Sequence, residues 1–160
     1  MDTTEPQVTG DAAQALKIHP PVLALALLVG TFILHLILPE SRTVHWHHAL
    51  GLLLVAAGMG CSFFAAALFQ ARETTKNPYG EPTALVVQMP YTFTRNPMYL
   101  GFTALLLGMA IFFDSIVMLI APAVFFAVID RMVIPREEAT MERLFGQQYR
   151  DYMGTVRRWL

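Results

Sequence analysis

Long stretches without charged residues are separated along the chain by short polar segments. The first two such stretches occupy residues 21–38 and 49–71. A helix needs about 20 mostly apolar residues to cross the hydrocarbon core of a lipid bilayer. Each stretch therefore predicts one membrane-spanning helix.

A third apolar stretch runs over residues 98–129, which is too long for a single crossing. The polar break in its middle is formed by Asp114 and Ser115. We therefore expect a tight hairpin at this point, which joins two spans at residues 98–113 and 115–134.

Polar residues near the end of the fourth predicted span mark a boundary. Asp130 and Arg131 lie there, and we expect them to pair with each other or to face a pocket. Pro135 follows. Because proline disrupts the interior of a helix, the span is expected to end before it.

The tail over residues 136–160 is predicted to be a separate helical segment on the membrane surface. Gly146 is expected to end its first short helix, because glycine is common just after a helix C-terminus. The apolar residues of the tail are spaced to share one helix face. These residues are Met141, Leu144, Phe145, Tyr149 and Tyr152.

Lysine and arginine are unevenly distributed between the two sides of these four spans. Arg42 is alone on one side, whereas the other side carries Lys17, Arg72, Lys76, Arg95 and the arginines after residue 129. Cytoplasmic loops of membrane proteins carry the excess of lysine and arginine. Both termini are therefore predicted to be cytoplasmic, with the segment 72–96 beside the tail.

The composition agrees with a membrane protein. Hydrophobic residues make up 55% of the 160 residues and charged residues only 14%, against roughly 25% charged residues in soluble domains. We predict an all-α polytopic membrane protein with four transmembrane helices and a C-terminal cytoplasmic helical segment. Residues 1–17 are expected to be a flexible cytoplasmic tail and residues 18–160 a single domain in a bacterial inner membrane. No nucleic-acid-binding motif accompanies the C-terminal arginines, so a nucleic-acid partner is not expected.

The single cysteine and the histidines are weaker candidates for function. Cys61 is the only cysteine, which rules out an intramolecular disulfide, and we expect it to be a small buried apolar residue. His45 and His48 have a spacing that can bind a metal on a helix. In a short loop they are expected to lie at the membrane interface, so no metal site is predicted. His35 lies inside the first span, near its outer end, and is expected to be a neutral imidazole that snorkels to the interface or is hydrogen-bonded.

Small residues four positions apart in the second span predict close packing against another helix. Single glycines in the third span are given the same role. The residues concerned are Ala56, Gly58, Gly60 and Ser62 in the second span, and Gly101 and Gly108 in the third.

The segment 91–101, which leads into the third span, carries the most informative polar residues. Asn96 is predicted to be the N-cap of a helix whose first residue is Pro97. The free amide groups and the dipole at that helix start, next to Arg95, suit an anion such as a cofactor carboxylate. The spacing alone also allows an ordinary helix start with an interfacial arginine.

A second polar block follows the fourth span and begins with Arg136, Glu137 and Glu138. Acidic residues in the first turn of a helix are stabilised by the helix dipole, so both glutamates can be purely structural. A functional role is indicated because the predicted topology places them on the same membrane face as Arg95.

Together, the two blocks resemble the isoprenylcysteine carboxyl methyltransferase family, which is similar to the phospholipid methyltransferases. The resemblance covers roughly residues 75–160 and rests on two separated motifs. They are residues 95–101, followed by Glu137-Glu138, Leu144-Phe145-Gly146, Tyr149, Tyr152 and Arg157-Arg158-Trp159. The sequence departs from the family at Met89-Pro90-Tyr91, where members usually have Gly-Pro-Tyr.

The resemblance implies a pocket for S-adenosylmethionine that opens to the cytoplasm, is capped by the C-terminal segment and admits a hydrophobic substrate from the lipid side. The cofactor-binding residues carried over by position are Tyr91, Arg95, Asn96, Tyr99, Glu137, Glu138 and Tyr149. The predicted catalytic residues are Arg95, Arg136 and Glu138. Either arginine would hold an acceptor carboxylate by a bidentate contact, whereas the glutamate would be the better partner for an acceptor amine.

The expected function is S-adenosylmethionine-dependent methyl transfer to a hydrophobic or prenylated small molecule, peptide or lipid, with an isoprenylcysteine-like carboxylate as acceptor. An ionised carboxylate needs no general base, so positioning supplies much of the acceleration. Three alternatives stay open: a phospholipid amine N-methyltransferase, an NADPH-dependent membrane reductase and a non-catalytic membrane protein. A soluble Rossmann methyltransferase is excluded, because the chain lacks a glycine-rich nucleotide loop.

Overall fold

The computed structural model describes residues 19–38, 47–72 and 85–160. All regular elements in these ranges are helical, as predicted. The predicted tail 1–17 lies outside the described residues, and so do Lys17, Arg42, His45, Trp46 and Lys76.

The first three helices follow the predicted spans closely. α1 (Pro20–Ile37) and α2 (His47–Arg72) coincide with the first two, and α3 (Pro97–Phe112) begins at the predicted proline. Pro20 and Pro97 lie in the first turns of their helices, where a missing backbone N–H breaks no hydrogen bond. Among the described residues, α1, α2 and the last long helix are long and apolar enough to cross a membrane, and α3 is a shorter apolar helix.

The chain turns sharply at the predicted hairpin. Asp114 adopts a left-handed conformation with a φ of 51°, and the amide of Ser115 donates to the Ala110 carbonyl at 3.0 Å. The buried Ser115 hydroxyl accepts a hydrogen bond from the amide of Met118 at 3.2 Å and so caps the start of the next helix. The two polar residues therefore form the turn, and the hairpin prediction is confirmed.

The fourth helix continues past Pro135 instead of ending there. It consists of the 3-10 turn η2 (Val117–Leu119), α4 (Ile120–Val128), the π turn η3 (Ile129–Val133) and α5 (Ile134–Phe145). In a regular α-helix, the ring of Pro135 would clash with the carbonyl of Arg131. The π turn just before the proline changes the hydrogen-bond pairing and accommodates the ring. The predicted helix end before Pro135 is therefore wrong.

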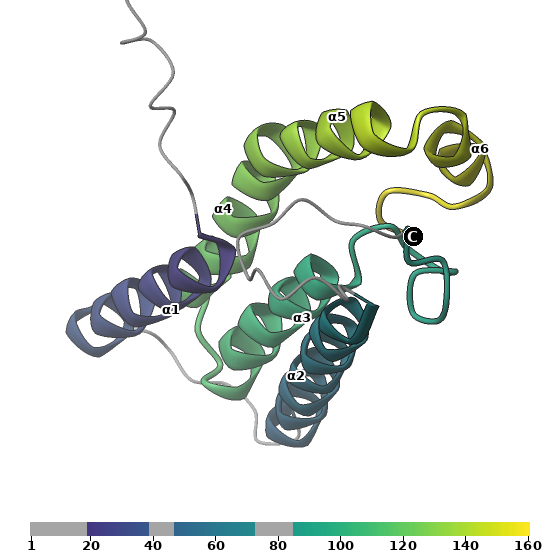
Figure 1. The fold of residues 1–160 in the computed structure, drawn as a ribbon. Coiled ribbons are helices and arrows are strands. Elements are labelled where there is room, and N and C mark those ends of the chain that lie inside the picture. The colour runs from purple at the N-terminus through teal and green to yellow at the C-terminus, as the bar shows by residue number, and fades with distance from the viewer. Residues whose placement is uncertain (1–18, 39–46, 73–84) are drawn as a thin grey trace, which may run out of the picture.

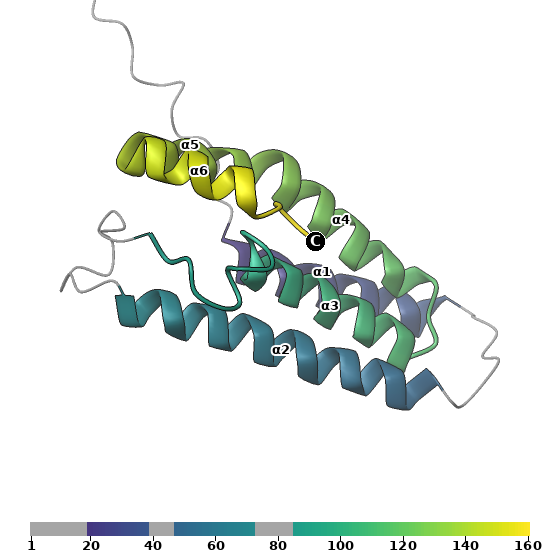
Figure 2. The same cartoon turned by 90° about the vertical axis from the view of Figure 1, so that its right-hand side faces the viewer.

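The C-terminal segment turns back over the bundle after α5. Gly146 follows this helix with a φ of 53°, as predicted for a glycine at that position. The chain continues in α6 (Gln147–Thr155), which follows the end of α5 and runs in a different direction (Figure 1; a second view is given in Figure 2). The predicted apolar face is thus divided between two helices: Tyr149 and Tyr152 are buried, and Met141, Leu144 and Phe145 are half-buried.

α2 and α3 run side by side in opposite directions, and glycines allow their backbones to touch (Figure 2). A Cβ atom placed on Gly58 would lie 2.5 Å from the carbonyl oxygen of Gly101. A Cβ atom on Gly108 would lie 2.7 Å from the carbonyl oxygen of Gly51. No side chain therefore fits at these crossing points, and the helices pack as closely as membrane helices with small residues do.

The predicted packing roles are confirmed for one side of α2 only. Ser62 lies on the same side as Gly58, and its hydroxyl donates to the Met98 carbonyl at 2.9 Å. Gly60 has no heavy atom within 4 Å of the place where its Cβ would be, and Ala56 is exposed. The prediction for Ala56 and Gly60 is therefore wrong, because the described helices leave that face of α2 uncovered.

The core lies between α1, α3 and the fourth helix, whose arrangement Figure 1 shows. α1 and α2 expose apolar flanks. Leu106, Phe125 and Ile129 are fully buried in this core. The exposed side chains on the flanks include Val22, Leu25, Val29, Ile33, Leu36, Leu52, Leu53, Phe63 and Phe64. Apolar surface of this extent is typical of a side that faces lipid, which supports an integral membrane protein.

Three further candidate residues, His35, His48 and Cys61, make contacts inside the helix bundle. His35 is buried with its ring centroid 5.9 Å from that of Phe113. The Nδ1 atom of His48 hydrogen bonds to the Phe112 carbonyl and ties the start of α2 to the end of α3. Cys61 is half-buried, less than expected, and its thiol donates to the Pro97 carbonyl at 3.4 Å.

Replacing Gly58 by alanine is expected to destabilise the protein. The new methyl group meets the backbone of α3, and overpacking of this kind typically costs about 1–3 kcal/mol. The matched control is Gly60→Ala on the uncovered face of the same helix, which is expected to be neutral or slightly stabilising because alanine favours helix formation. Thermal unfolding in detergent measures both variants, and equal melting temperatures would contradict the packing described above.

Candidate active site

A cavity of about 370 Å³ lies where the N-terminus of α3, α5 and α6 meet. Its volume is within the range of about 300–1,000 Å³ that small-molecule sites have. All the predicted site residues border it: Tyr91, Arg95, Asn96, Tyr99, Arg136, Glu137, Glu138 and Tyr149. The rest of the wall consists of Phe69, Leu85, Val86, Pro97, Met98, Thr140, Met141 and Tyr152. The two sequence blocks therefore converge on one cavity.

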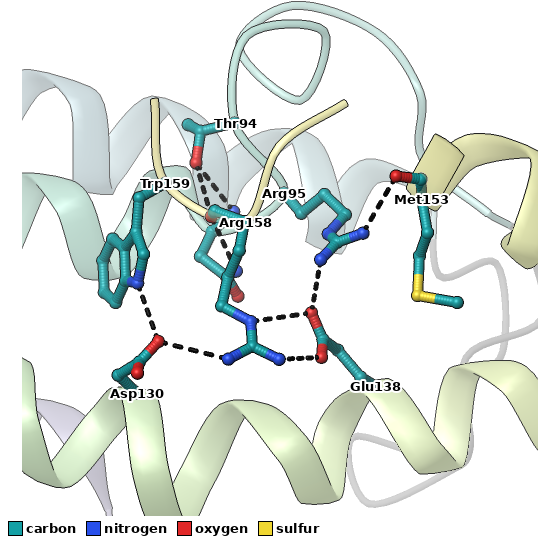
Figure 3. A network of polar contacts seen from close by, with 8 residues as sticks. Thr94, Arg95, Asp130, Glu138, Met153, Arg158 and Trp159 are labelled. Atoms are coloured by element: carbon teal, nitrogen blue, oxygen red, sulfur yellow. Dashed lines mark hydrogen bonds and ion pairs between the residues drawn. The ribbon is translucent and has the colours of Figure 1, made fainter. Parts of the chain in front are cut away.

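The carboxylate of Glu138 is shared by two arginines (Figure 3). Arg95 Nη2 donates to Glu138 Oε1 at 2.9 Å, and Arg158 Nη2 donates to Oε2 at 2.6 Å. Arg158 Nε adds a third hydrogen bond to Oε1 at 3.2 Å. The side chains of Arg95 and Glu138 are only 12% and 15% exposed. Water therefore screens this pair poorly, and the contact holds α5 against the loop before α3.

Arg95 is fixed by several contacts and keeps one free donor. Its backbone amide donates to the Arg157 carbonyl at 2.9 Å, and its Nη1 donates to the Met153 carbonyl at 3.3 Å. The Nε atom is buried and has no hydrogen-bond partner among the described residues. A buried donor without a partner is costly, so this atom is suited to a ligand acceptor.

Glu137 is oriented by α3 rather than by an arginine. The buried Tyr99 hydroxyl donates to Glu137 Oε1 at 2.6 Å. Within the described part of the chain, the second oxygen of this carboxylate accepts no hydrogen bond, and the residue borders the cavity. The two adjacent glutamates therefore differ, because Glu138 is saturated and Glu137 has an acceptor to spare.

Three buried tyrosines form the wall between α6 and the loop before α3. The Tyr152 hydroxyl donates to the Tyr91 carbonyl at 2.6 Å, and the Tyr91 hydroxyl donates to the Ala65 carbonyl at 3.3 Å. Burial, together with the nearby Glu137, raises the pKa of Tyr91 to about 12. Burial and the nearby Glu138 raise the pKa of Tyr149 to about 12 as well. At neutral pH these phenols are uncharged hydrogen-bond donors.

Asn96 occupies the predicted N-cap position of α3, but its side chain does not cap the helix. Its Nδ2 donates to the Arg158 carbonyl at 3.0 Å instead. Thr94 Oγ1 donates to the same carbonyl at 3.0 Å and accepts a hydrogen bond from the Asn96 amide. The side-chain amide is used in this way because the extended segment after α6 brings an unpaired carbonyl next to it.

Three residues of the network lie outside the predicted site. Asp130 Oδ1 accepts hydrogen bonds from Arg158 Nη1 at 3.3 Å and from Trp159 Nε1 at 2.8 Å. The Trp159 ring also packs on Phe126, with centroids 4.5 Å apart. Asp130 therefore pairs with the C-terminal segment rather than with the exposed Arg131. The sequence signal for this contact was the Arg157-Arg158-Trp159 motif, which had no assigned role.

Comparison with known proteins agrees with this geometry. A family model described as phospholipid methyltransferase matches residues 46–148, which is more than half of the chain. The chain belongs to the phospholipid methyltransferase family. An uncharacterized protein of Haemophilus influenzae is 36% identical over 63 residues, which cover 39% of this chain and all of that relative. No solved structure matches the chain significantly.

Membership in the phospholipid methyltransferase family confirms the predicted resemblance and indicates a membrane methyltransferase. The matched residues include the loop before α3 and the adjacent glutamates Glu137 and Glu138. They end at residue 148, before Tyr149, Arg158 and Trp159. The contacts made by the C-terminal segment are therefore a finding of the structure and not of the comparison.

The Glu138→Gln variant is expected to lower the free energy of unfolding by about 3 kcal/mol. Removing one partner of a buried ion pair typically costs about 3–5 kcal/mol, and the lower end applies because the Arg158 side chain is 35% exposed. The control is Glu142→Gln, which breaks the exposed pair with Arg150 and is expected to cost about 0–1 kcal/mol. Denaturant unfolding in detergent compares the variants, and a similar loss for both would contradict the difference in burial.

Proposed function

We propose that the chain transfers a methyl group from S-adenosylmethionine to a lipid-tailed acceptor whose reacting group is a carboxylate. The observation that carries this proposal is the single cavity that unites Arg95, Tyr99, Arg136 and Glu137 in a chain of the phospholipid methyltransferase family. The cofactor, the acceptor and the residue roles below all belong to this proposal.

The polar wall of the cavity fits S-adenosylmethionine, which carries a carboxylate, an amino group and a positive sulfonium. The buried Arg95 Nε, which has no partner in the described residues, is a donor for the carboxylate. Glu137, oriented by Tyr99, is an acceptor for the amino group. The aromatic rings of Tyr91 and Tyr149 attract positive charge. When bound, this cofactor supplies an electrophilic methyl group.

Arg136 is assigned to the acceptor. It borders the cavity, and its side chain forms no ion pair or hydrogen bond within the described residues. An arginine can bind a carboxylate with two parallel hydrogen bonds, which orients the attacking oxygen. Because an ionised carboxylate has no proton to lose, the chain needs to position the acceptor and not to deprotonate it.

The apolar part of the cavity is assigned to the lipid tail. Phe69 comes from the end of α2, Leu85 and Val86 from the segment before the loop, and Met141 from α5. These side chains line the cavity together with the polar groups above. An acceptor with a charged head and an apolar tail therefore matches the wall better than a wholly polar one.

A phospholipid amine is the second candidate acceptor. It is favoured by the description of the family model. Both oxygens of Glu138 are occupied by arginines, so this residue is assigned to holding Arg95 in place. The family match favours methyl transfer over reduction with NADPH and over a non-catalytic role.

We extend the proposal to four crossings with both termini in the cytoplasm. α3 has 16 residues, or about 24 Å at 1.5 Å per residue, which is short for a hydrocarbon core of about 30 Å. It packs along α2, and their contacts extend from Gly58 and Gly101 to Gly51 and Gly108. Since α2 is long enough to span the membrane, α3, which packs along it, lies at the same depth in the bilayer. Residues 18–160 then form one domain in a bacterial inner membrane, with the cavity on the cytoplasmic side.

Changing Glu137 to glutamine is expected to weaken the binding of S-adenosylmethionine by about 10- to 100-fold, because a hydrogen bond to a charged group contributes roughly 1.5–3 kcal/mol. Tyr99→Phe is expected to weaken it less, since it removes only the orienting hydrogen bond. Calorimetric titration of the purified protein measures the dissociation constants. Glu142→Gln serves as the control on the same helix. Unchanged affinity in Glu137→Gln would show that this carboxylate does not contact the cofactor.

Replacing Arg136 by alanine is expected to raise the KM for the acceptor about ten-fold and to leave the affinity for the cofactor unchanged. The assay uses labelled S-adenosylmethionine and protein in nanodiscs, with either a prenylcysteine analogue or phosphatidylethanolamine as acceptor. Arg143→Ala, on the same helix but away from the cavity wall, is the control. A base-labile product is expected from the methyl ester. A label that stays on the amine headgroup after base treatment would support the second candidate. The absence of labelled product from both acceptors would refute both candidates.

A further inference from the structure

Arg158 holds two carboxylates of one helix without bordering the cavity. Figure 3 shows Asp130 and Glu138 pointing from the same helix toward its guanidinium group. Every nitrogen of that group donates: Nε and Nη2 to Glu138, and Nη1 to Asp130. An arginine whose three nitrogens all donate is held in one orientation, since its planar fork matches both acceptors.

The π turn explains why one arginine reaches both acids. In a regular α-helix, residues eight positions apart are rotated by about 80° around the axis. A π turn takes in one additional residue, so Asp130 and Glu138 stand nearly as residues seven apart do, rotated by about 20°. Without η3, the two acids would be rotated further apart around the helix axis.

The backbone of Arg158 is held as well. The Arg158 carbonyl accepts hydrogen bonds from the side chains of Thr94 and Asn96 in the loop before α3. The neighbouring Trp159 donates to Asp130 and packs on Phe126. Residues 158–159 thus connect the loop before α3 to the fourth helix, and we call this set of contacts the clasp.

We propose that Arg158 is a positioning residue of the methyl-transfer site, which acts through Glu138 to hold Arg95 and α5 at the cavity. This inference rests on the function proposed above. With Arg158 removed, the Glu138 carboxylate keeps only the contact with Arg95. A single contact does not hold the carboxylate in one orientation. The donor at Arg95 Nε and the acceptor at Glu137, one residue before Glu138, lose their fixed separation.

The first test needs no ligand. Spin labels are placed on cysteines at the exposed positions Thr92 and Ala139, in the loop and on α5, after replacement of Cys61 by serine. Pulsed electron paramagnetic resonance spectroscopy then measures the distribution of distances between the two labels. Arg158→Ala is expected to broaden it, and Arg157→Ala, an exposed neighbour that loses the same charge, is expected to leave it narrow. An unchanged distribution in Arg158→Ala would overturn the clasp.

The second test asks whether the clasp matters for the site. Arg158→Ala is expected to weaken cofactor binding and to lower kcat about 100-fold, the size of effect that a displacement of about 1 Å can have. Arg158→Lys is expected to recover part of the activity, because a lysine can still contact Glu138. In Glu138→Gln, adding Arg158→Ala is expected to cause no further loss of affinity, since both act through the same contact.

The outcomes separate this inference from the proposed function. If the wild-type protein binds the cofactor and Arg158→Ala binds it equally well with an unchanged kcat, Arg158 is not a positioning residue. A loss in Arg158→Ala that equals the loss in Arg157→Ala would also overturn the inference, because it would reflect charge alone. If the wild-type protein neither binds the cofactor nor transfers methyl groups, the proposed function fails together with this role of Arg158, and the distance measurement still decides the clasp.

Discussion

The structure depends on a half-buried carboxylate that lies between two arginines from different parts of the chain. Glu138 on α5 pairs with Arg95 before α3 and with Arg158 after α6. These three segments are otherwise joined by single hydrogen bonds, such as those of Asn96 to the Arg158 carbonyl and of Tyr99 to Glu137. Removing Glu138 leaves the poorly exposed Arg95 without an acidic partner, which is costly in a poorly hydrated site.

The membrane helices give this contact a rigid base. Glycines let α2 and α3 approach until their backbones touch, which fixes the start of α3 and the loop that leads into it. The π turn in the fourth helix then sets the rotation of α5, so that its acidic residues face that loop. Two backbone features inside the bundle therefore determine where the polar groups of the cavity lie.

Much of the fold and of the cavity wall could be predicted from the sequence, because both depend on local patterns. Apolar length marked the helices, Asp114 and Ser115 marked the hairpin, and two motifs indicated the residues around the cavity. The continuation through Pro135 and the pairing of Asp130 could not be predicted in the same way. A π turn leaves no trace in hydrophobic spacing, and the contact of Asp130 with Arg158 joins positions that are distant in sequence.

We propose that the cavity between Arg95 and Glu137 binds S-adenosylmethionine. Ultraviolet crosslinking of labelled cofactor to the purified protein, followed by mass spectrometry of its peptides, tests this most directly. We expect label on peptides that contain Tyr91, Tyr99 or Tyr149, and we expect an excess of the demethylated product to suppress it. Label confined to the lipid-facing sides of α1 and α2, or label that the product does not suppress, would contradict the account.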